Sequence, residues 1–485
     1  MPATMRFLTI ILLLLSANSL LLAQSKSLYQ TDFPPEEFAE RRAQIFDTIG
    51  DNAIAIVQGA SYVDGFKVFR QSNQFYYLSG IEVPSAYLLL DGRSRKTTLY
   101  LPHADAGRER GEGEMLTAED ADEVKQLTGI DNVYGVHLMA RHWMRYLTKT
   151  PYPLLYTPLS PAEGAMQSRD EAVGGQGMIA ADPWDGRPSR EGQFVHLLRI
   201  RFPQFEIRDL SPVLDEMRIV KSPREVALVR RATQIAGLAL MEAMRSTRPG
   251  VMEYQLDAAA HYIFQINGAR GEGYSSITAG GTNAWMGHYF HNSSVLRDGD
   301  LVLMDYAPDY RYYTSDVARM WPVNGRFTAE QRELYEFILA YRDVIVKHIR
   351  PGLTPEQVTA ACANEMKGYF STHQFSKPHY EKACRAALTF RGHLSHPVGL
   401  TVHDVGVYRR KPLVAGTVFS IDPMIWVPEE KLYIRIEDVV VVTEDGVENF
   451  SAFVPSKLDD IEKWMAREGV LQKTPPEQDF DRLRK

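Results

Sequence analysis

Two acidic residues in the second half of the chain stand at the ends of apolar segments, and their spacing could support chemistry. The segment 301–304 runs into Asp305, and Asp316 follows eleven residues later, ahead of further strand-like sequence. If the chain folds back between them, the two carboxylates lie opposite each other across a hairpin, with Cβ atoms about 4.5–5.5 Å apart. Like charges this close on a buried strand pair are unfavourable unless a cation lies between them.

The same arrangement recurs further along the chain. The apolar segment 418–421 ends in Asp422, and a turn predicted at 428–431 returns the chain to Glu437, which we expect roughly opposite. Two such acid pairs, each at the end of a hydrophobic strand, predict a metal site built from carboxylates.

Two glycine-punctuated segments add histidines to these acids. Residues 279–292 read AGGTNAWMGHYFHN, and residues 392–406 read GHLSHPVGLTVHDVG. A single histidine is more often a packed or exposed residue than a ligand, but four candidate carboxylates alter that expectation. Carboxylates with one imidazole suit Mn²⁺, Fe²⁺, Co²⁺ or Zn²⁺, and the lack of thiolates argues against a structural zinc site. Four carboxylates exceed the needs of one catalytic ion, which favours a two-metal site.

An internal repeat predicts how these residues are positioned. Residues 248–256 resemble 350–358, and residues 296–305 resemble 413–422. Each copy follows a long helix that begins at a predicted capping box, one at Ser222 and one at residue 328. We therefore expect two related halves between about 216 and 455 that face each other and bring the four acids into one central site.

Composition and length set the frame for this site. A chain of 485 residues is too long for one core, and 45% hydrophobic with 24% charged residues is typical of a globular protein. The net charge is −7 without a basic block, so we expect no nucleic-acid partner. We predict an N-terminal domain at 29–180, a linker at 181–215, the catalytic domain at 216–455 and a polar C-terminal tail at 456–485 without catalytic residues. Cys362 and Cys384 could pair, but we favour two separate buried thiols.

The first 23 residues have the pattern of a secretory signal peptide. Arg6 precedes an apolar segment at 7–15, and small residues lead to Ala23, where we place the cleavage. An uncleaved membrane anchor is the alternative, but the polar residues within 16–19 interrupt the run that a spanning helix needs. We expect an exported protein, periplasmic or secreted, without stable membrane association after removal of the signal.

From about residue 210 to 455 the chain resembles the pita-bread metallopeptidases, specifically their aminopeptidase P and proline dipeptidase branch. The most specific motifs are the Asp305/Asp316 hairpin that runs into WPVNG, then SHPVGLTVHDVG, and YIRIED. Residues 30–180, with FRQSNQFYYLSG, resemble the N-terminal domain of that branch. The resemblance implies an α+β protein in which a pita-bread domain of two pseudo-symmetric helix/β-hairpin halves follows a smaller α/β domain.

The resemblance also implies roles for individual residues. Two divalent ions, usually Mn²⁺ with Zn²⁺, Co²⁺ or Fe²⁺ as alternatives, would be held by five ligands, with Asp316 and Glu437 bridging: Asp305, Asp316, His396, Asp422 and Glu437. Asp422 would also accept a proton from the attacking water. His288 and His403 would be histidines outside the ligand set that hold the substrate and stabilise the developing oxyanion.

The sequence departs from the family pattern at two positions. The family usually has Glu where this chain has Asp422, which keeps the charge but shortens the side chain by one methylene. A histidine usually stands four residues before the metal histidine, where this chain has Gly392, with His393 one position later. These departures affect the expected metal preference and the substrate contacts near the proline pocket.

The activity implied is hydrolysis of the peptide bond between an N-terminal residue and a following proline, with proline-containing peptides as substrates. An Xaa-Pro dipeptidase, a creatinase-like hydrolase and a non-catalytic pita-bread binding protein are the alternatives. We leave a homo-oligomer open as well. The aromatic residues 75–77 would either contribute to the pocket of a neighbouring subunit or belong to the core of their own domain.

Overall fold

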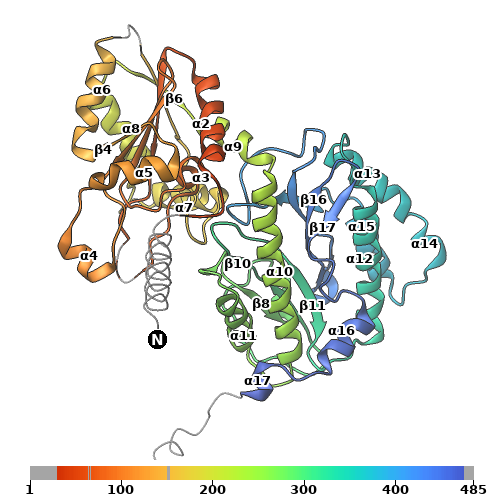
Figure 1. Ribbon diagram of the computed structural model, residues 1–485. Helices are drawn as coiled ribbons and strands as arrows, with labels where there is room; N and C mark the ends of the chain where they lie inside the picture. Colours follow the sequence, from red (N-terminus) through yellow and green to blue (C-terminus); the bar gives the residue numbers. More distant parts are fainter. Residues whose placement is uncertain (1–29, 64, 66, 150–152, 475–485) are drawn as a thin grey trace, which may run out of the picture. The chain divides into compact units, whose positions relative to one another are not determined.

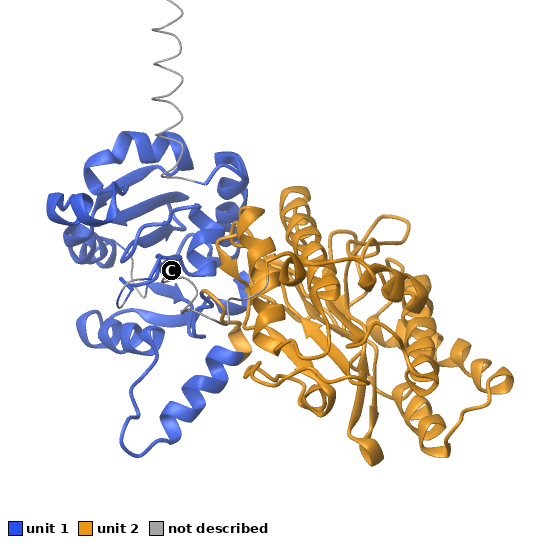
Figure 2. Ribbon diagram, turned by 90° about the horizontal axis from the view of Figure 1, so that it is seen from below, with its two compact units in different colours: residues 1–164, 171–214 blue, residues 165–170, 215–485 orange. Residues whose placement is uncertain are grey.

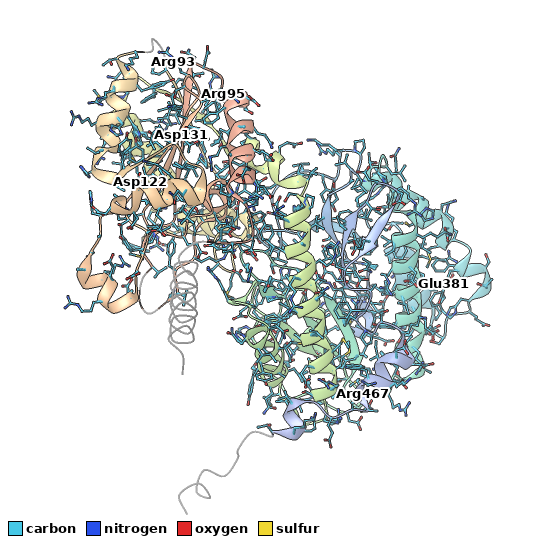
Figure 3. The ribbon with its side chains drawn as sticks, in the orientation of Figure 1. Arg93, Arg95, Asp122, Asp131, Glu381 and Arg467 are labelled. Atoms are coloured by element: carbon cyan, nitrogen blue, oxygen red, sulfur yellow. The ribbon has the colours of Figure 1, made fainter. Side chains whose placement is uncertain are left out.

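The computed structural model describes residues 30–63, 65, 67–149 and 153–474 (Figure 1). They form two compact units, one of residues 30–164 and 171–214, the other of residues 165–170 and 215–474 (Figure 2). The predicted signal peptide lies outside the described residues. No described helix is long and apolar enough to cross a membrane. Labelled charged residues such as Arg93, Asp122 and Arg467 project from the surface of their own units (Figure 3).

The first unit is built on one mixed six-stranded sheet with the order β4-β3-β2-β1-β5-β6. Its strands are β1 (Ala53–Gln58), β2 (Tyr87–Asp91), β3 (Lys96–Leu101), β4 (Asn132–Gly135), β5 (Leu154–Thr157) and β6 (Glu206–Asp209). The pairs β1–β2 and β2–β3 are antiparallel, whereas β3–β4, β1–β5 and β5–β6 are parallel. Its helices are α2 (Pro35–Ile49), α3 (Asn73–Ser79), α4 (Ala106–Glu112), α5 (Ala121–Thr128), α6 (Met139–Leu147) and α8 (Arg190–Arg201). Helix α7 (Arg169–Ala181) belongs to this unit from residue 171 onwards.

The segment 181–215 was predicted as a linker, but most of it folds as part of the first unit. Helix α8 begins after Ser189, whose Oγ accepts a hydrogen bond from the backbone N–H of Gly192, and it buries Phe194 and Leu198 in the core of the first unit. Strand β6 then adds to the sheet beside β5. The prediction was wrong because a polar, proline-rich stretch precedes α8 and charged residues surround the apolar face of the helix.

The aromatic residues in α3 belong to the core of the first unit. Phe75, Tyr76 and Tyr77 are 0%, 1% and 4% exposed. Side chains this deeply buried are held by their own unit, which supports the domain-core alternative over a contribution to a neighbouring subunit's pocket.

The second unit places helices on both flanks of a set of short antiparallel sheets (Figure 1). The sheets are β11-β9-β8, β12-β13-β16-β17, β14-β15 and β10-β7. The strands are β7 (Gly271–Glu272), β8 (Ile277–Gly280), β9 (Leu301–Asp305), β10 (Pro308–Asp309), β11 (Ala318–Pro322), β12 (Leu394–Pro397), β13 (Val418–Ile421), β14 (Met424–Val427), β15 (Leu432–Arg435), β16 (Asp438–Val442) and β17 (Val447–Asn449). The helices are α9 (Ser211–Ile219), of which residues 215–219 belong to this unit, α10 (Pro223–Ser246), α11 (Glu253–Ile266), α12 (Ala329–His348), α13 (Pro355–Met366), α14 (Tyr369–Thr372), α15 (Pro378–Ala387), α16 (Leu458–Met465) and α17 (Val470–Lys473).

The internal repeat is visible in the backbone hydrogen bonds. In the first copy, the turn between α10 and α11 has Gly250 at φ 93°, and its N–H donates to Leu296 O at 2.9 Å. In the second copy, the turn between α12 and α13 has Gly352 at φ 87°, and its N–H donates to Leu413 O at 2.8 Å. Each turn therefore fixes the segment that leads into the acid-bearing strand of its own copy.

The segment after residue 455 is partly folded against this unit, in contrast to the polar tail that we predicted. Helix α16 buries Leu458, Ile461 and Met465 in the main core, and Trp464 Nε1 donates to Met241 O in α10 at 2.8 Å. The prediction was wrong because the apolar residues of α16 recur at helical spacing between many charges. Both cysteines are buried and free, as we favoured.

Candidate metal centre

The first acid pair lies at the end of the β9–β11 hairpin. Asp305 pairs across the ladder with Ala318, so Asp316 is its diagonal neighbour rather than its direct partner. The expected pairing was wrong by two residues, because the intervening chain leaves the ladder to pair β10 with β7. The two carboxylates still approach each other: Tyr274 Oη donates to Asp305 Oδ1 at 2.6 Å and lies 3.0 Å from Asp316 Oδ1.

The second acid pair lies where the β13–β16 ladder passes into the β14–β15 hairpin. Ile421 pairs with Asp438 at the last position of the ladder, so Asp422 and Glu437, one step further, lie opposite each other as expected. The predicted turn is present as the short helix η5 (Pro428–Glu430) between β14 and β15.

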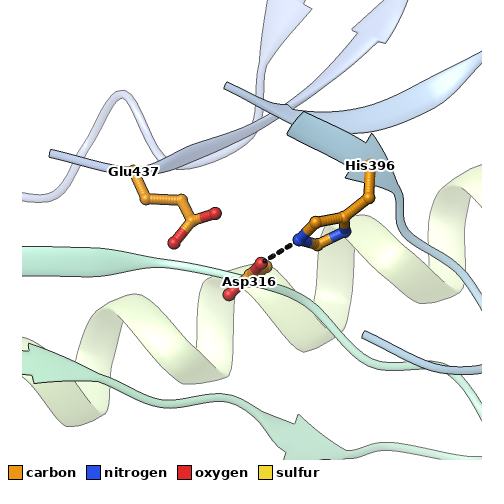
Figure 4. Close-up of side chains that lie close together, drawn as sticks. All are labelled: Asp316, His396 and Glu437. Carbon is orange, nitrogen blue, oxygen red and sulfur yellow. Dashed lines mark ion pairs between the residues drawn. The ribbon is translucent and has the colours of Figure 1, made fainter. Parts of the chain in front are cut away.

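His396 joins the two acid pairs from strand β12. Its Nε2 lies 3.2 Å from Asp316 Oδ2 (Figure 4), and its Nδ1 lies 3.2 Å from Pro397 O. One ligand atom from each of Asp316, His396 and Glu437 lies within 4.8 Å of the others. If the His396 ring is neutral and donates its Nδ1–H to Pro397 O, its Nε2 lone pair faces the Asp316 carboxylate. Two such acceptors lie this close only when a proton or a cation lies between them.

Arg435 connects Asp305 and Asp422 with Glu437. Its Nη1 donates to Asp305 Oδ2 at 2.8 Å, its Nε donates to Asp422 Oδ1 at 2.7 Å, and its Nη2 binds Glu437. The Arg435 side chain is 9% exposed, and three charge-assisted hydrogen bonds hold its guanidinium within the site. All five predicted ligands therefore lie in one cluster that comes from both copies of the repeat.

A second layer holds the strand of Glu437 in place. Arg319 Nη1 donates to the backbone oxygen of Glu437 at 2.6 Å, and its Nη2 donates to Asp438 Oδ1 at 2.6 Å. Arg342 Nη1 donates to the other oxygen of Asp438 at 2.7 Å. Burial would raise the pKa of Asp438, but these two guanidinium groups hold it below its usual value. The buried ion cluster therefore fixes Glu437 through its backbone.

The charges inside the centre do not balance. The four acids are at most 4% exposed, and Arg435 is the fixed positive charge among them. Burial raises the pKa of Asp305 to about 7, that of Asp422 above its usual value and that of Glu437 well above it. Burial acts on Asp316 in the same direction, but the hydrogen bond and charge of His396 lower its pKa overall. The cluster therefore needs protons or cations to be stable.

The residues fit divalent metal ions. Oxygen and imidazole nitrogen are ligands that Mn²⁺, Zn²⁺, Co²⁺ and Fe²⁺ accept. Among the described residues, the buried Glu437 Oε1 has no hydrogen-bond partner, and a buried carboxylate oxygen without a donor is costly unless an ion binds it. Divalent ions would supply the positive charge that the cluster lacks.

His403 and His288 lie next to this centre. The ring centroid of His403 is 4.1 Å from that of His396 and 6.4 Å from that of His288. Nδ1 of His403 lies 2.7 Å from Asp170 Oδ2, in the short segment 165–170 that packs with the second unit. A carboxylate at Nδ1 fixes the tautomer of an imidazole and directs Nε2 away from it.

His393 does not replace the histidine that the family has at the position of Gly392. It is fully buried, with Nε2 2.7 Å from Ala387 O and Nδ1 3.3 Å from Asp422 O. Its backbone oxygen accepts a hydrogen bond from Asp422 N–H at 2.7 Å. His393 therefore supports the backbone of Asp422 from within the core, where a peptide cannot reach it.

Three residues of the site were missed by the sequence analysis. Arg435 stands two residues before Glu437, and the two-residue period of a strand could have placed both on one face. Tyr274 and Asp170 lie in segments without a recognisable pattern, and only the folded chain brings them to the acids and to His403.

Comparison with known proteins gives the family of the chain. The family model described as metallopeptidase family M24 matches residues 227–444, and the model of the aminopeptidase P N-terminal domain matches residues 38–156. The Xaa-Pro aminopeptidase of Escherichia coli (strain K12) is 32% identical over 451 residues, which cover 89% of this chain and 97% of that protein.

Solved structures of E. coli aminopeptidase P share the fold. The complex with the inhibitor Pro-Leu has a TM-score of 0.72 at 28% identity and covers 90% of this chain and 99% of its own. A zinc-substituted complex with product has a TM-score of 0.72 at 29% identity, with the same coverage. The predicted α+β architecture, with a pita-bread domain after an N-terminal α/β domain, is confirmed. The chain is therefore a metallopeptidase of family M24 and belongs to its aminopeptidase P branch.

Proposed function

We propose that the chain is an exported Xaa-Pro aminopeptidase that uses two divalent metal ions, with manganese preferred and zinc, cobalt or iron as alternatives. The observation that carries the proposal is the cluster of Asp316, His396 and Glu437, to which Arg435 joins Asp305 and Asp422, with Glu437 Oε1 lacking a donor among the described residues. The similar protein of E. coli is an Xaa-Pro aminopeptidase, and a solved relative holds zinc.

In this proposal the five predicted ligands would hold the ions. Bound divalent ions lower the pKa of a water molecule towards neutrality and polarise a carbonyl. The described geometry supports this assignment through the cluster of Asp316, His396 and Glu437 and through the link that Arg435 makes between the other acids.

Asp422 is the residue we assign to proton transfer. Arg435 fixes one oxygen of the carboxylate, and the backbone of Asp422 is tied to His393 O. A carboxylate held in this way can take the proton of the attacking water and deliver it to the leaving nitrogen of proline. The aspartate is one methylene shorter than the usual glutamate, so its reach to the attacking water depends more strongly on the position that Arg435 and His393 fix.

His403 and His288 are the residues we assign to the substrate. With Asp170 accepting the Nδ1–H, His403 can carry a second proton on Nε2, and this imidazolium, beside His396, can donate to the carbonyl oxygen as negative charge develops. His288 is exposed and neighbours His403, with 6.4 Å between the ring centroids, so a peptide can reach it from solvent.

The substrate class follows from the relatives rather than from a described pocket. The curated and solved proteins that we compared are aminopeptidases, which favours removal of one residue from longer Xaa-Pro peptides over splitting of dipeptides. A binding protein without activity would have no need of an imidazole and four acids around one site.

Export is supported by the signal-peptide pattern at residues 1–23. N-terminal sequencing of the protein made by its own cells tests this. We expect the mature chain to begin near residue 24. An intact N-terminus at Met1 or residue 2 would show that the segment is retained.

The substrate preference can be measured directly with the mature protein. We expect the manganese-loaded enzyme to cleave Xaa-Pro-Xaa tripeptides at least about tenfold faster, in kcat/KM, than Xaa-Pro dipeptides, which corresponds to about 1.4 kcal/mol of transition-state binding. Chelation should abolish the activity and added Mn²⁺ restore it. Glu437→Gln, purified in parallel, controls for contaminating peptidases. Faster cleavage of dipeptides would favour the dipeptidase instead.

The assignment of His403 predicts a role for Asp170. Asp170→Asn keeps the size of the side chain but removes the charge at Nδ1, so kcat should fall about 10- to 100-fold, as for other partners that orient functional imidazoles. The alkaline limb of the kcat profile should shift to lower pH, because the donating imidazolium loses a stabilising carboxylate and therefore gives up its proton at lower pH. Asp182→Asn, an exposed acid after α7, is the matched control. Unchanged kcat and pH profile in both variants would contradict the role of Asp170.

A further inference from the structure

A second cluster of histidines lies in the first unit, at one edge of its sheet. Strands β3 and β4 run parallel, with Leu101 opposite Gly135. His103 and His137 each stand two residues beyond these partners, so both leave the sheet at the carboxyl ends of neighbouring strands. In sheets with parallel strands this edge is where ligands commonly bind.

The two imidazoles and one carboxylate form a chain of contacts. His103 Nε2 lies 2.8 Å from His137 Nδ1, and the ring centroids are 4.9 Å apart. On the other side of the ring, His103 Nδ1 lies 2.6 Å from Glu119 Oε1. The second oxygen of Glu119 accepts the N–H of Ala104 at 2.9 Å. Glu119 is therefore fixed by the backbone and in turn fixes His103.

These contacts determine which nitrogen carries a lone pair. The hydrogen bonds from His103 and from the Ala104 amide hold the pKa of Glu119 at about 2, so the carboxylate is ionised and accepts the Nδ1–H of His103. In the neutral ring, His103 Nε2 is then an acceptor that points at His137. A carboxylate behind a histidine, with the opposite nitrogen available, is the arrangement that usually supports metal-ligating histidines.

We propose that His103 Nε2 and His137 Nδ1 form a binding site for a transition metal ion that prefers imidazole, namely Zn²⁺, Cu²⁺ or Ni²⁺, with Glu119 orienting His103 from behind. Such a site is distinct in chemistry from the carboxylate-rich centre of the second unit, because nitrogen ligands favour zinc and copper over manganese.

The geometry requires only a small adjustment. Two nitrogen atoms bound to tetrahedral zinc at 2.0–2.1 Å are about 3.3 Å apart, so the pair needs to open by about half an ångström and His137 to carry its proton on Nε2. The side chain of His103 is 53% exposed, so an ion can enter from solvent and water can complete its coordination.

Gly135 leaves room for the two imidazole nitrogens, because it has no side chain. A Cβ atom at this position would lie 2.5 Å from His103 Nε2 and 2.7 Å from His137 Nδ1. The backbone there has φ −68° and ψ 142°, which any residue adopts. Glycine is therefore explained by the approach of the imidazoles rather than by backbone conformation.

The proposal is tested with the full chain and with Zn²⁺ as the probe. Zinc bound at equilibrium is counted after dialysis and its affinity measured by calorimetry, in wild type and in single variants. His103→Ala and His137→Ala should each lose one zinc ion per chain relative to wild type. Glu119→Gln should bind that ion about 10- to 100-fold more weakly, and Gly135→Ala should weaken it while retaining both histidines.

His142→Ala is the matched control, because this histidine lies in the same unit but its Nδ1 is bonded to Tyr100 Oη at 3.0 Å. It should keep the full zinc content. With one equivalent of Cu²⁺, the paramagnetic resonance spectrum should show two nitrogen ligands in wild type and one in His137→Ala. Equal zinc content and affinity in wild type, His103→Ala and His137→Ala would overturn the proposal and leave only a hydrogen-bonded pair. The same copper spectrum in wild type and His137→Ala would also overturn it.

Discussion

The second unit depends on the electrostatic cost of burying four carboxylates in one place. Asp305, Asp316, Asp422 and Glu437 are almost inaccessible to water, and one guanidinium offsets part of their charge. Because a buried charge without compensation costs several kcal/mol, the site can exist only if protons or cations complete the balance. Divalent ions would do so while leaving the carboxylates ionised, as ligation and proton transfer require. The fold around the site has to supply the remaining free energy.

The acids are positioned by the repeat and by a layer of buried ion pairs. Each copy joins two helices through a glycine turn bonded to the segment before its acid-bearing strand, so the acids are placed by backbone hydrogen bonds as well as by packing. Behind Glu437, two guanidinium groups converge on Asp438. The predicted ligands are thus set on rigid elements, which is what a metal site with defined geometry needs.

Much of this arrangement could be predicted from the sequence, because strand ends, capping boxes and a repeat leave local patterns. Asp422 and Glu437 were placed correctly because a tight turn sets their register. Asp305 and Asp316 were placed two residues out of register, since pairing of β10 with β7 is a long-range event that no local pattern records. Tyr274 and Asp170 reach the site through such long-range contacts too. The helices α8 and α16 were missed because charged residues surround their short apolar faces.

The most direct test of the account is to count metal ions in the folded protein and locate them. Crystals of the manganese-loaded mature chain, measured at the manganese absorption edge, should show two anomalous peaks per chain, both in contact with Glu437 and Asp316. Elemental analysis of the same sample should give two ions per chain. A folded protein that takes up no manganese or zinc, with Arg435 alone balancing the four acids, would contradict the account.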